Sequence, residues 1–197
     1  MSGYEQVSTL ILASTSPRRI DLLRSLGIAF ELAESEVGEE WRDDIPIAEL
    51  VERNALAKAS SVARKLERGL VIGADTVVSC EGAVFGKPSD IEDARRMLRA
   101  LAGRTHQVYS GVAVVRARDG TAKTAHAITD VTFRPLSEKQ IAKYLQMIDP
   151  LDKAGAYAIQ GVGGIIVEKI CGCYYNVVGL PLTVLDNLLA HFGVQLL

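Results

Sequence analysis

The feature that most constrains the fold is a strand, a turn of hydroxyl side chains and a helix that follow one another within residues 10–27. Leu10–Ala13 is a short apolar run, and helical spacing begins directly after Ser16-Pro17. Serine is favoured just before a helix and proline at its first position, which predicts a helix start there. Gly27 is expected to end the helix. Its buried stripe is expected to comprise Ile20, Leu22, Leu23 and Leu26.

Two arginines, Arg18 and Arg19, fall in the first turn of this predicted helix. A helix N-terminus already carries partial positive charge and unpaired N–H groups, so cations there oppose the helix dipole. One interpretation is that both arginines, with Ser14 and Ser16, surround an anion such as a phosphate group. The other is that they are ordinary solvated arginines. The local sequence leaves both interpretations open.

Strand and helix patterns alternate in the first half of the chain, and a tight hairpin is predicted at Asp119-Gly120 in the second. This combination favours an α/β fold with a mixed, twisted sheet flanked by helices. Strands are expected at 28–33, 70–79, 83–85, 107–118, 121–134 and 165–170, and helices at 47–68, 90–102, 137–147 and from Pro181 onward. With 197 residues, 48% of them hydrophobic, residues 1–197 suit one domain or two closely joined lobes.

Charge and cysteine content exclude several classes of partner. The formal net charge of −2 provides no general attraction to nucleic acid. No apolar run is long enough to span a bilayer, and Met1–Gln6 does not have the features of a signal peptide. The three cysteines, Cys80, Cys171 and Cys173, lack the paired spacing of a zinc site. We therefore expect a reduced, cytoplasmic protein.

Lys58 lies in the centre of the apolar stripe of the predicted 47–68 helix, between Val51 and Val62. A lysine in that position must extend to solvent, pair with an acid or reach an anion in a cleft. Replacing Lys58 with alanine is expected to raise stability, because it removes a charge from the apolar stripe. An acidic run, Glu34–Glu40, precedes the helix. It is either a solvated loop or a source of carboxylates for a hard cation.

Asp75 is the most informative single residue, because apolar residues flank it on both sides within the strand predicted at 70–79. Ionised carboxylates are rarely buried unless they are paired or bind a metal. Gly73 and Ala74 leave space beside it, as a strand that faces a ligand requires. The alternative is a structural aspartate that bonds a neighbouring loop. A further lysine, Lys87, lies between Gly86 and Pro88, which restrict the direction of its loop.

Several cations and a few carboxylates together are what metal-assisted phosphoryl chemistry needs. Arginine and lysine bind phosphate oxygens, while carboxylates bind Mg²⁺ and accept a proton from water. The chain contains no G-x-x-x-x-G-K-[ST] element, which excludes P-loop chemistry.

Five blocks, in order along the chain, resemble the Maf family of nucleoside triphosphate pyrophosphatases. They are Ala13-Ser-Thr-Ser-Pro-Arg-Arg-Ile-Asp-Leu-Leu, Gly73-Ala-Asp-Thr-Val-Val, Gly86-Lys-Pro, Asp152-Lys-Ala-Gly-Ala-Tyr-Ala-Ile-Gln-Gly and Val178-Gly-Leu-Pro-Leu. The resemblance spans about Leu10 to Phe192. It implies an inosine-triphosphatase-like fold with an active-site cleft between two lobes. It also implies hydrolysis of a nucleoside triphosphate to the monophosphate and pyrophosphate.

The resemblance also implies roles for individual residues. The family's catalytic aspartate corresponds to Asp75 and its phosphate-binding lysines to Lys58 and Lys87. The second carboxylate corresponds best to Glu39, with Glu40 as the adjacent alternative. Asp75 and Glu39 would hold the divalent cation, Mg²⁺ or in its place Mn²⁺ or Co²⁺. Substrate-binding positions are Ser14, Ser16, Arg18, Arg19, Lys58, Thr76, Lys87 and Gln160.

Three positions separate the subfamilies, and this chain has Arg18, Thr76 and Gln160 there. That trio resembles the branch that acts on dTTP and UTP, whereas the branch that acts on 7-methyl-GTP carries Trp, Gln and Glu. A glutamine amide offers both a donor and an acceptor, which suits the acceptor–donor–acceptor edge of uracil or thymine. A carboxylate, which only accepts, suits the adjacent donors of guanine better.

Two alternatives remain from the sequence. The first is a regulator that binds nucleotide or nucleic acid without turnover, since the family is linked to septum formation in cell division. Carboxylates that repel phosphate argue against a pure binder. The second is a pyrophosphatase for 7-methyl-GTP or other non-standard nucleotides. The expected partner is the nucleoside triphosphate, with no nucleic acid or membrane, and the oligomeric state is left open between monomer and homodimer.

Overall fold

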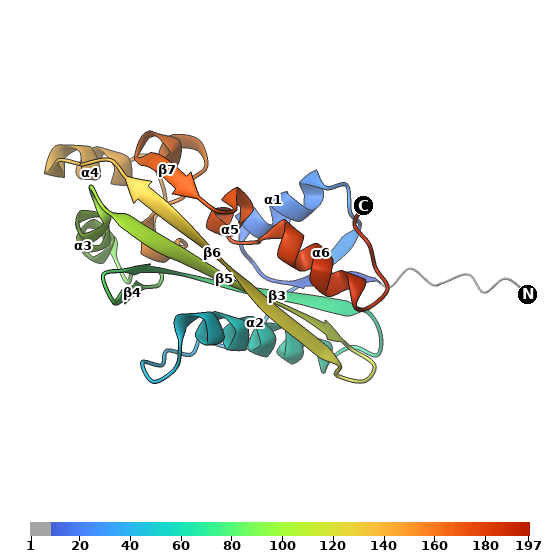
Figure 1. Cartoon of the computed structure of the whole chain (residues 1–197). Helices are drawn as coiled ribbons and strands as arrows, with labels where there is room; N and C mark the ends of the chain where they lie inside the picture. Colours follow the sequence, from blue (N-terminus) through green and yellow to red (C-terminus); the bar gives the residue numbers. More distant parts are fainter. Residues whose placement is uncertain (1–8) are drawn as a thin grey trace, which may run out of the picture. The chain divides into compact units, whose positions relative to one another are not determined.

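The computed structural model describes residues 9–197 (Figure 1). Residues 1–8, which include the Met1–Gln6 segment expected not to be a signal peptide, lie outside the described residues. The strands are β1 (Leu10–Ala13), β2 (Phe30–Ala33), β3 (Leu70–Cys80), β4 (Ala83–Phe85), β5 (Thr105–Arg116), β6 (Ala122–Phe133) and β7 (Val167–Cys171). The α-helices are α1 (Pro17–Ser25), α2 (Ile47–Ala63), α3 (Ile91–Leu101), α4 (Glu138–Leu145), α5 (Tyr174–Val178) and α6 (Leu182–Ala190). Two 3₁₀ turns, η1 (Ala154–Ala156) and η2 (Gly161–Ile165), complete the elements of residues 9–197.

The strands form one seven-stranded mixed sheet in the order β2-β1-β3-β5-β6-β7, with β4 paired to β3. β1 runs parallel to β2 and to β3, whereas the β3–β4 and β6–β7 pairs are antiparallel. The turn between β5 and β6 is closed by the Gly120 N–H, which donates to the Arg116 carbonyl at 2.9 Å. The predicted α/β class, with a mixed sheet and helices against it, is confirmed.

The chain divides into two compact units, within each of which residues lie close together in space. Of the described residues, unit 1 comprises 9–75, 111–126 and 182–197, and unit 2 comprises 76–110 and 127–181. Each unit has its own apolar core. The core of unit 1 includes Ile11, Ala55, Ala59, Val71 and Ala113. That of unit 2 includes Leu98, Leu101, Phe133, Ile141 and Tyr157.

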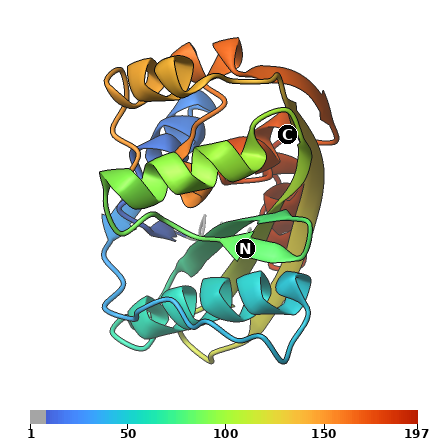
Figure 2. The ribbon, with the colours of Figure 1, turned by 90° about the vertical axis from the view of Figure 1, so that its left-hand side faces the viewer.

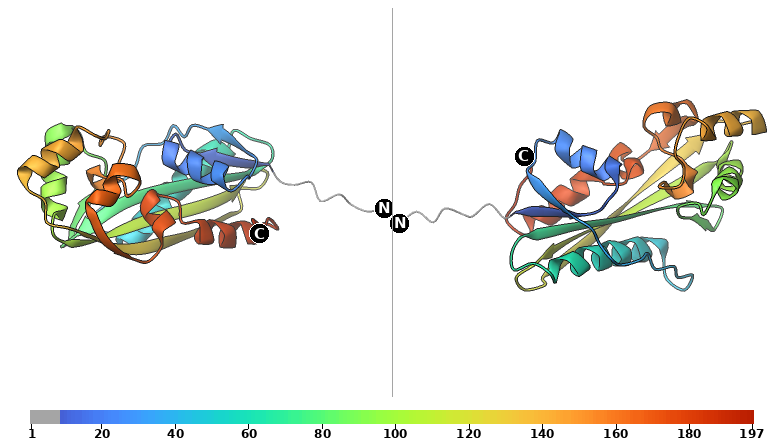
Figure 3. Two further views of the ribbon diagram at one scale, coloured as in Figure 1. Left: turned by 90° about the horizontal axis from the view of Figure 1, so that it is seen from above. Right: turned by 180° about the vertical axis from the view of Figure 1, so that it is seen from behind.

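In unit 1, α2 covers one face of the strands, and α1 and α6 lie on the opposite face (Figures 1 and 3). Glycine permits the close approach of α2. A Cβ added to Gly73 on β3 would lie 2.2 Å from the Ala55 carbonyl oxygen, and one added to Gly111 on β5 would lie 2.3 Å from the Val51 backbone. These two glycines therefore determine how closely α2 approaches the sheet.

In unit 2, α3 lies beside α4 (Figure 2). α4 begins with a capping box, in which Ser137 Oγ accepts from the Gln140 N–H and the Gln140 side chain accepts from the Ser137 N–H. Within the described residues, no helix combines the length and apolar character that crossing a membrane requires.

Four local predictions are wrong. Ser16 occupies the position before α1, but its side chain makes no capping bond, and Leu26 is exposed because α1 ends one residue earlier. The predicted 47–68 helix stops at Ala63, after which single turns lead to Gly69, whose φ of +110° suits glycine. Ile165 belongs to η2, so the last strand begins at Val167. The short helix α5 was not predicted.

Candidate functional site

A polar cluster in unit 1 is built around Asp75, whose side chain is only 3% exposed on β3. Lys58 Nζ donates to Asp75 Oδ1 at 2.7 Å. Asn54 Nδ2 donates to Asp75 Oδ2 at 3.0 Å. Each carboxylate oxygen therefore has a donor from α2. Both donors lie on a helix, so these contacts differ from the alternative, in which a structural aspartate bonds a neighbouring loop.

Lys58 also joins the acidic loop, which is defined here as residues 34–40, to this cluster. Its Nζ donates to Glu39 Oε1 at 3.0 Å, and the lysine side chain is 13% exposed. Lys58 therefore pairs with two carboxylates and does not simply extend to solvent. Between the two acids that the sequence left open, Glu39 contacts Lys58. The Glu40 carboxylate lies 3.7 Å from Arg42 at the surface.

The geometry of α2 brings these donors to Asp75. Asn54 and Lys58 are four residues apart, so their side chains lie on the same face of the helix. The space beside Asp75 that Gly73 leaves is filled by α2, because the missing Cβ faces Ala55 and Ala59. The expectation that this space faces a ligand is therefore wrong. Instead, the absence of a side chain on Gly73 allows α2 to come within hydrogen-bonding distance of β3.

Asn54 was missed by the sequence reasoning, although it is 4% exposed. Its Oδ1 accepts from the Glu40 N–H at 2.9 Å, and its Nδ2 also donates to the Glu40 carbonyl at 3.1 Å. The available signal was a polar residue four positions before Lys58 on the buried face of a predicted helix. Such residues are buried only with hydrogen-bond partners.

The turn before α1 approaches the same cluster through Arg19. Its Nη1 donates to the carbonyl of Ala74, the residue before Asp75, at 2.9 Å. Burial lowers the pKa of Arg19 from its ordinary value, and the nearby Asp75 carboxylate opposes that shift. Within the turn, Ser14 Oγ accepts from the Ser16 N–H at 3.2 Å. Arg18, half-buried in the first turn of α1, lies close enough to Arg19 for repulsion between the two charges.

The remaining predicted residues belong to unit 2. Thr76 Oγ1 lies 2.9 Å from Ser110 Oγ, which donates to the carbonyl of buried Asn176 at 3.0 Å. Lys87 and Gln160 are both exposed, on separate loops. The Gly155 N–H donates to the Gly86 carbonyl at 3.0 Å, which joins the loop of Lys87 to the segment that leads to Gln160.

The donor set at Asp75 and Glu39 fits a hard divalent cation. Among residues 9–197, no group of three or more His, Cys, Asp or Glu side chains is arranged to hold a metal. Mg²⁺, however, is usually bound through one or two carboxylates together with water and substrate phosphates. Two carboxylates that share one lysine therefore suit a cation that binds together with a triphosphate.

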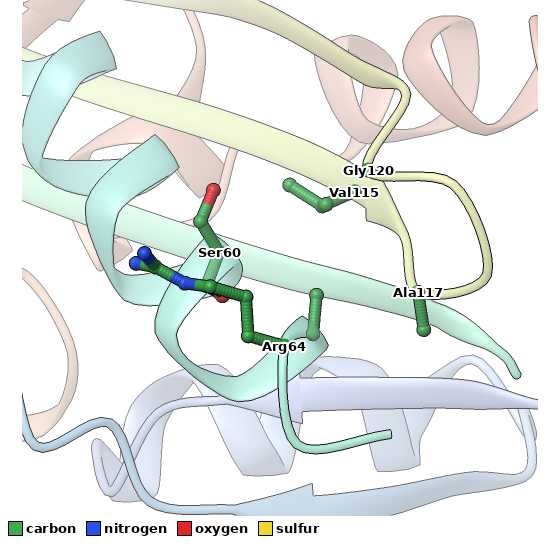
Figure 4. Close-up of a pocket in the computed structure, with 6 residues that line it drawn as sticks. Ser60, Arg64, Val115, Ala117 and Gly120 are labelled. Atoms are coloured by element: carbon green, nitrogen blue, oxygen red, sulfur yellow. Dashed lines mark hydrogen bonds between the residues drawn. The ribbon is translucent and has the colours of Figure 1, made fainter. Parts of the chain in front are cut away.

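A separate hollow in unit 1 lies near the C-terminal end of α2 and is lined by Ser60, Ala63, Arg64, Val115, Ala117 and Gly120 (Figure 4). Arg64 Nε donates to the Ser60 carbonyl at 3.1 Å, so the guanidinium lies along its own helix. None of the six lining residues has a carboxylate, and none is a predicted site residue. This hollow has no groups for acid–base chemistry.

A family model and several related sequences match almost the whole chain. The family model described as "Maf-like protein" matches residues 9–192. The dTTP/UTP pyrophosphatase of Moorella thermoacetica is 53% identical over 189 residues, which cover 96% of this chain and 97% of that protein. The proteins of the same name from Symbiobacterium thermophilum and Desulforamulus reducens are 50% and 44% identical, over 93% and 95% of this chain and 94% and 98% of their own. The solved structure of the Staphylococcus aureus Ham1 protein covers 64% of this chain and 71% of its own, with 15% identity and a TM-score of 0.44.

Proposed function

This chain belongs to the family of Maf-like proteins, and from that membership we propose that it is a nucleoside triphosphate pyrophosphatase that acts on dTTP and UTP. The reaction converts the triphosphate to the nucleoside monophosphate and pyrophosphate. Relatives named for this activity match over nearly the full length of both chains, which supports the proposal. Residues 1–197 would then act as one catalytic domain, in a reduced, cytoplasmic protein.

The observation that carries the chemistry is the pairing of Lys58 with both Asp75 and Glu39, at 2.7 and 3.0 Å. A lysine that holds two carboxylates together is suited to exchange one of those contacts for a phosphate oxygen. The carboxylates are then available for a cation and for a proton from water. A pure nucleotide binder has no use for such acids beside a triphosphate, because they repel it.

In the proposed mechanism, the residues of this chain bind the triphosphate and direct water to the α-phosphorus. Ser14, Ser16, Arg18 and Arg19 would bind phosphate oxygens together with the N-terminal amides of α1, and Lys58 and Lys87 would neutralise the charge of the departing pyrophosphate. Asp75 would accept the proton of the attacking water. The bond between the α-phosphorus and the bridging oxygen breaks as the new bond to the water oxygen forms.

Asp75 and Glu39 would hold the divalent cation, which neutralises phosphate charge when bound. Arg18, Thr76 and Gln160 would select the base, with the Gln160 amide providing a donor and an acceptor to the pyrimidine edge.

Product analysis in ¹⁸O-labelled water tests this function. The protein with UTP and Mg²⁺ is expected to release UMP and pyrophosphate in equal amounts, with the label in UMP. UDP and orthophosphate as first products would show attack at the γ-phosphate, and label in pyrophosphate would show attack at the β-phosphate. Either result contradicts the mechanism. A parallel series with dTTP, GTP and 7-methyl-GTP tests the substrate class, and binding of all four without products would favour the regulator alternative.

A further inference from the structure

Asn54 makes three hydrogen bonds within the site, although the proposed mechanism gives it no role. Its side-chain amide bonds Asp75 Oδ2, the Glu40 N–H and the Glu40 carbonyl, at 3.0, 2.9 and 3.1 Å. The residue is 4% exposed, on the face of α2 that packs against the sheet. Leaving a buried amide unpaired is costly, so these contacts define one arrangement of all three groups.

These contacts connect the two carboxylates of the site through the helix. Asp75 lies on β3, whereas Glu39 precedes Glu40 in the acidic loop. The loop also contacts α2 through Lys58, which donates to Glu39 Oε1 at 3.0 Å, and through Ser35 Oγ, which lies 2.9 Å from Ser61 Oγ. Among these contacts, the one at Asn54 is made to the backbone of Glu40, the residue after Glu39. The Asn54 side chain bonds both the N–H and the carbonyl of Glu40, as a neighbouring peptide unit would.

We propose that Asn54 is a positioning residue that sets the separation of the Asp75 and Glu39 carboxylates and so determines the affinity of the site for its divalent cation. This inference rests on the proposed function for its enzymatic consequence, but its structural part is independent of turnover. Groups that orient metal ligands through hydrogen bonds typically affect metal affinity or activity 10–100-fold.

Asn54→Leu is the informative substitution, because leucine has the same branching and heavy-atom count as asparagine but no polar atoms. Asn54→Ala is the second variant if leucine prevents folding, since alanine has no steric demand and favours helix. Ser61→Ala is the matched control. It removes a different contact between the acidic loop and the same helix, the Ser35–Ser61 hydrogen bond, and leaves Asn54, Asp75 and Glu40 unchanged.

Hydrogen exchange of the Glu40 amide, followed by NMR, tests the attachment without any enzymatic assay. In the unaltered protein this amide is expected to be protected, because it donates to Asn54 Oδ1. Asn54→Leu should abolish the protection, and Ser61→Ala should preserve it. An unprotected Glu40 amide in the unaltered protein, or full protection in Asn54→Leu or Asn54→Ala, overturns the proposal.

Mn²⁺ binding measured by electron paramagnetic resonance, with α,β-imido-UTP as a non-hydrolysed substrate analogue, tests the consequence for the cation. Asn54→Leu is expected to weaken Mn²⁺ binding about tenfold. In turnover it should raise the half-saturating Mg²⁺ concentration by a similar factor. Unchanged Mn²⁺ affinity overturns the proposal even if the protein is a pyrophosphatase. If the unaltered protein shows no pyrophosphatase activity, the proposed function fails, while Glu40 exchange and Mn²⁺ binding still decide the role of Asn54.

Discussion

Lys58 Nζ lies 2.7 Å from Asp75 Oδ1, and this pair joins the centre of the apolar stripe of α2 to the centre of the buried strand β3. The lysine and aspartate side chains are 13% and 3% exposed. Each of these charged residues is anomalous within its own element. Their contact explains how both are tolerated, because a buried charge requires a partner.

Lys58→Ala is expected to lower stability by about 3 kcal/mol near neutral pH, since it leaves the Asp75 carboxylate buried without its counter-ion. The sequence alone suggested the opposite sign, a gain from removing a charge from an apolar stripe. Denaturant unfolding without metal measures the change. Lys65→Ala removes a surface pair with Glu36 and should cost at most about 1 kcal/mol. A stabilised Lys58→Ala protein would contradict the pairing.

Asp75→Asn is expected to lower kcat by about 100-fold or more, because the amide neither accepts a proton from water nor binds a cation as a carboxylate does. The protein should remain folded, since asparagine has nearly the same shape and burying it costs less than burying a charge. Steady-state kinetics and a melting curve measure both effects. The exposed Asp21→Asn serves as the control. An unfolded Asp75→Asn would indicate a structural role, and full activity would exclude a catalytic one.

Gln160→Glu is expected to reduce kcat/KM for UTP and dTTP by about 10–100-fold, because it removes the amide donor and places a negative charge near base carbonyls. A hydrogen bond lost in a closed site costs roughly 1–3 kcal/mol. The value for guanine nucleotides should fall less or rise. Gln160→Ala should reduce selectivity without that bias toward guanine. Equal losses on every nucleotide would show that Gln160 supports its loop and does not select the base.

His106 is expected to make stability depend on pH between about 6.5 and 4. It is 1% exposed, its Nε2 lies 2.8 Å from Tyr157 Oη, and Phe133 and Tyr157 pack edge-on against it. Burial lowers the pKa of His106 from 6.5 to about 4. The unfolded chain therefore binds a proton in this interval that the folded protein does not. His106 thus favours unfolding as the pH falls from about 6.5 to 4, by up to about 3 kcal/mol.

Urea unfolding at pH 7 and pH 4.5 measures this dependence. His106→Gln, which has no titrating ring, should show a smaller loss of stability between the two pH values than the unaltered protein. His191→Gln, at an exposed position, should retain the full loss. An identical loss in all three proteins would show that His106 does not contribute.

The sequence was sufficient for the order of elements and for several individual residues of the candidate site. Periodicity identified α2 and β3, because those segments are long and strongly patterned, and the Asp119-Gly120 turn signal identified the β5–β6 hairpin. Lys58 and Asp75 were identified because a charge within an apolar pattern is conspicuous. The short helix α5 and the C-terminal end of α2 were not predicted correctly, because a few residues carry too little periodic signal to override their tertiary surroundings.

Only the tertiary structure decided which polar groups meet. Asn54 has no charge and attracted no attention in the sequence, yet it bonds Asp75, 21 residues away. The choice between Glu39 and Glu40 depends on how the acidic loop lies against α2, which Asn54 holds through the Glu40 backbone. The predicted sign of the Lys58→Ala effect changes for the same reason. Contacts of this kind follow from the close approach of α2 to Gly73 and Gly111, and a register between distant elements is set by packing, which local sequence patterns do not encode.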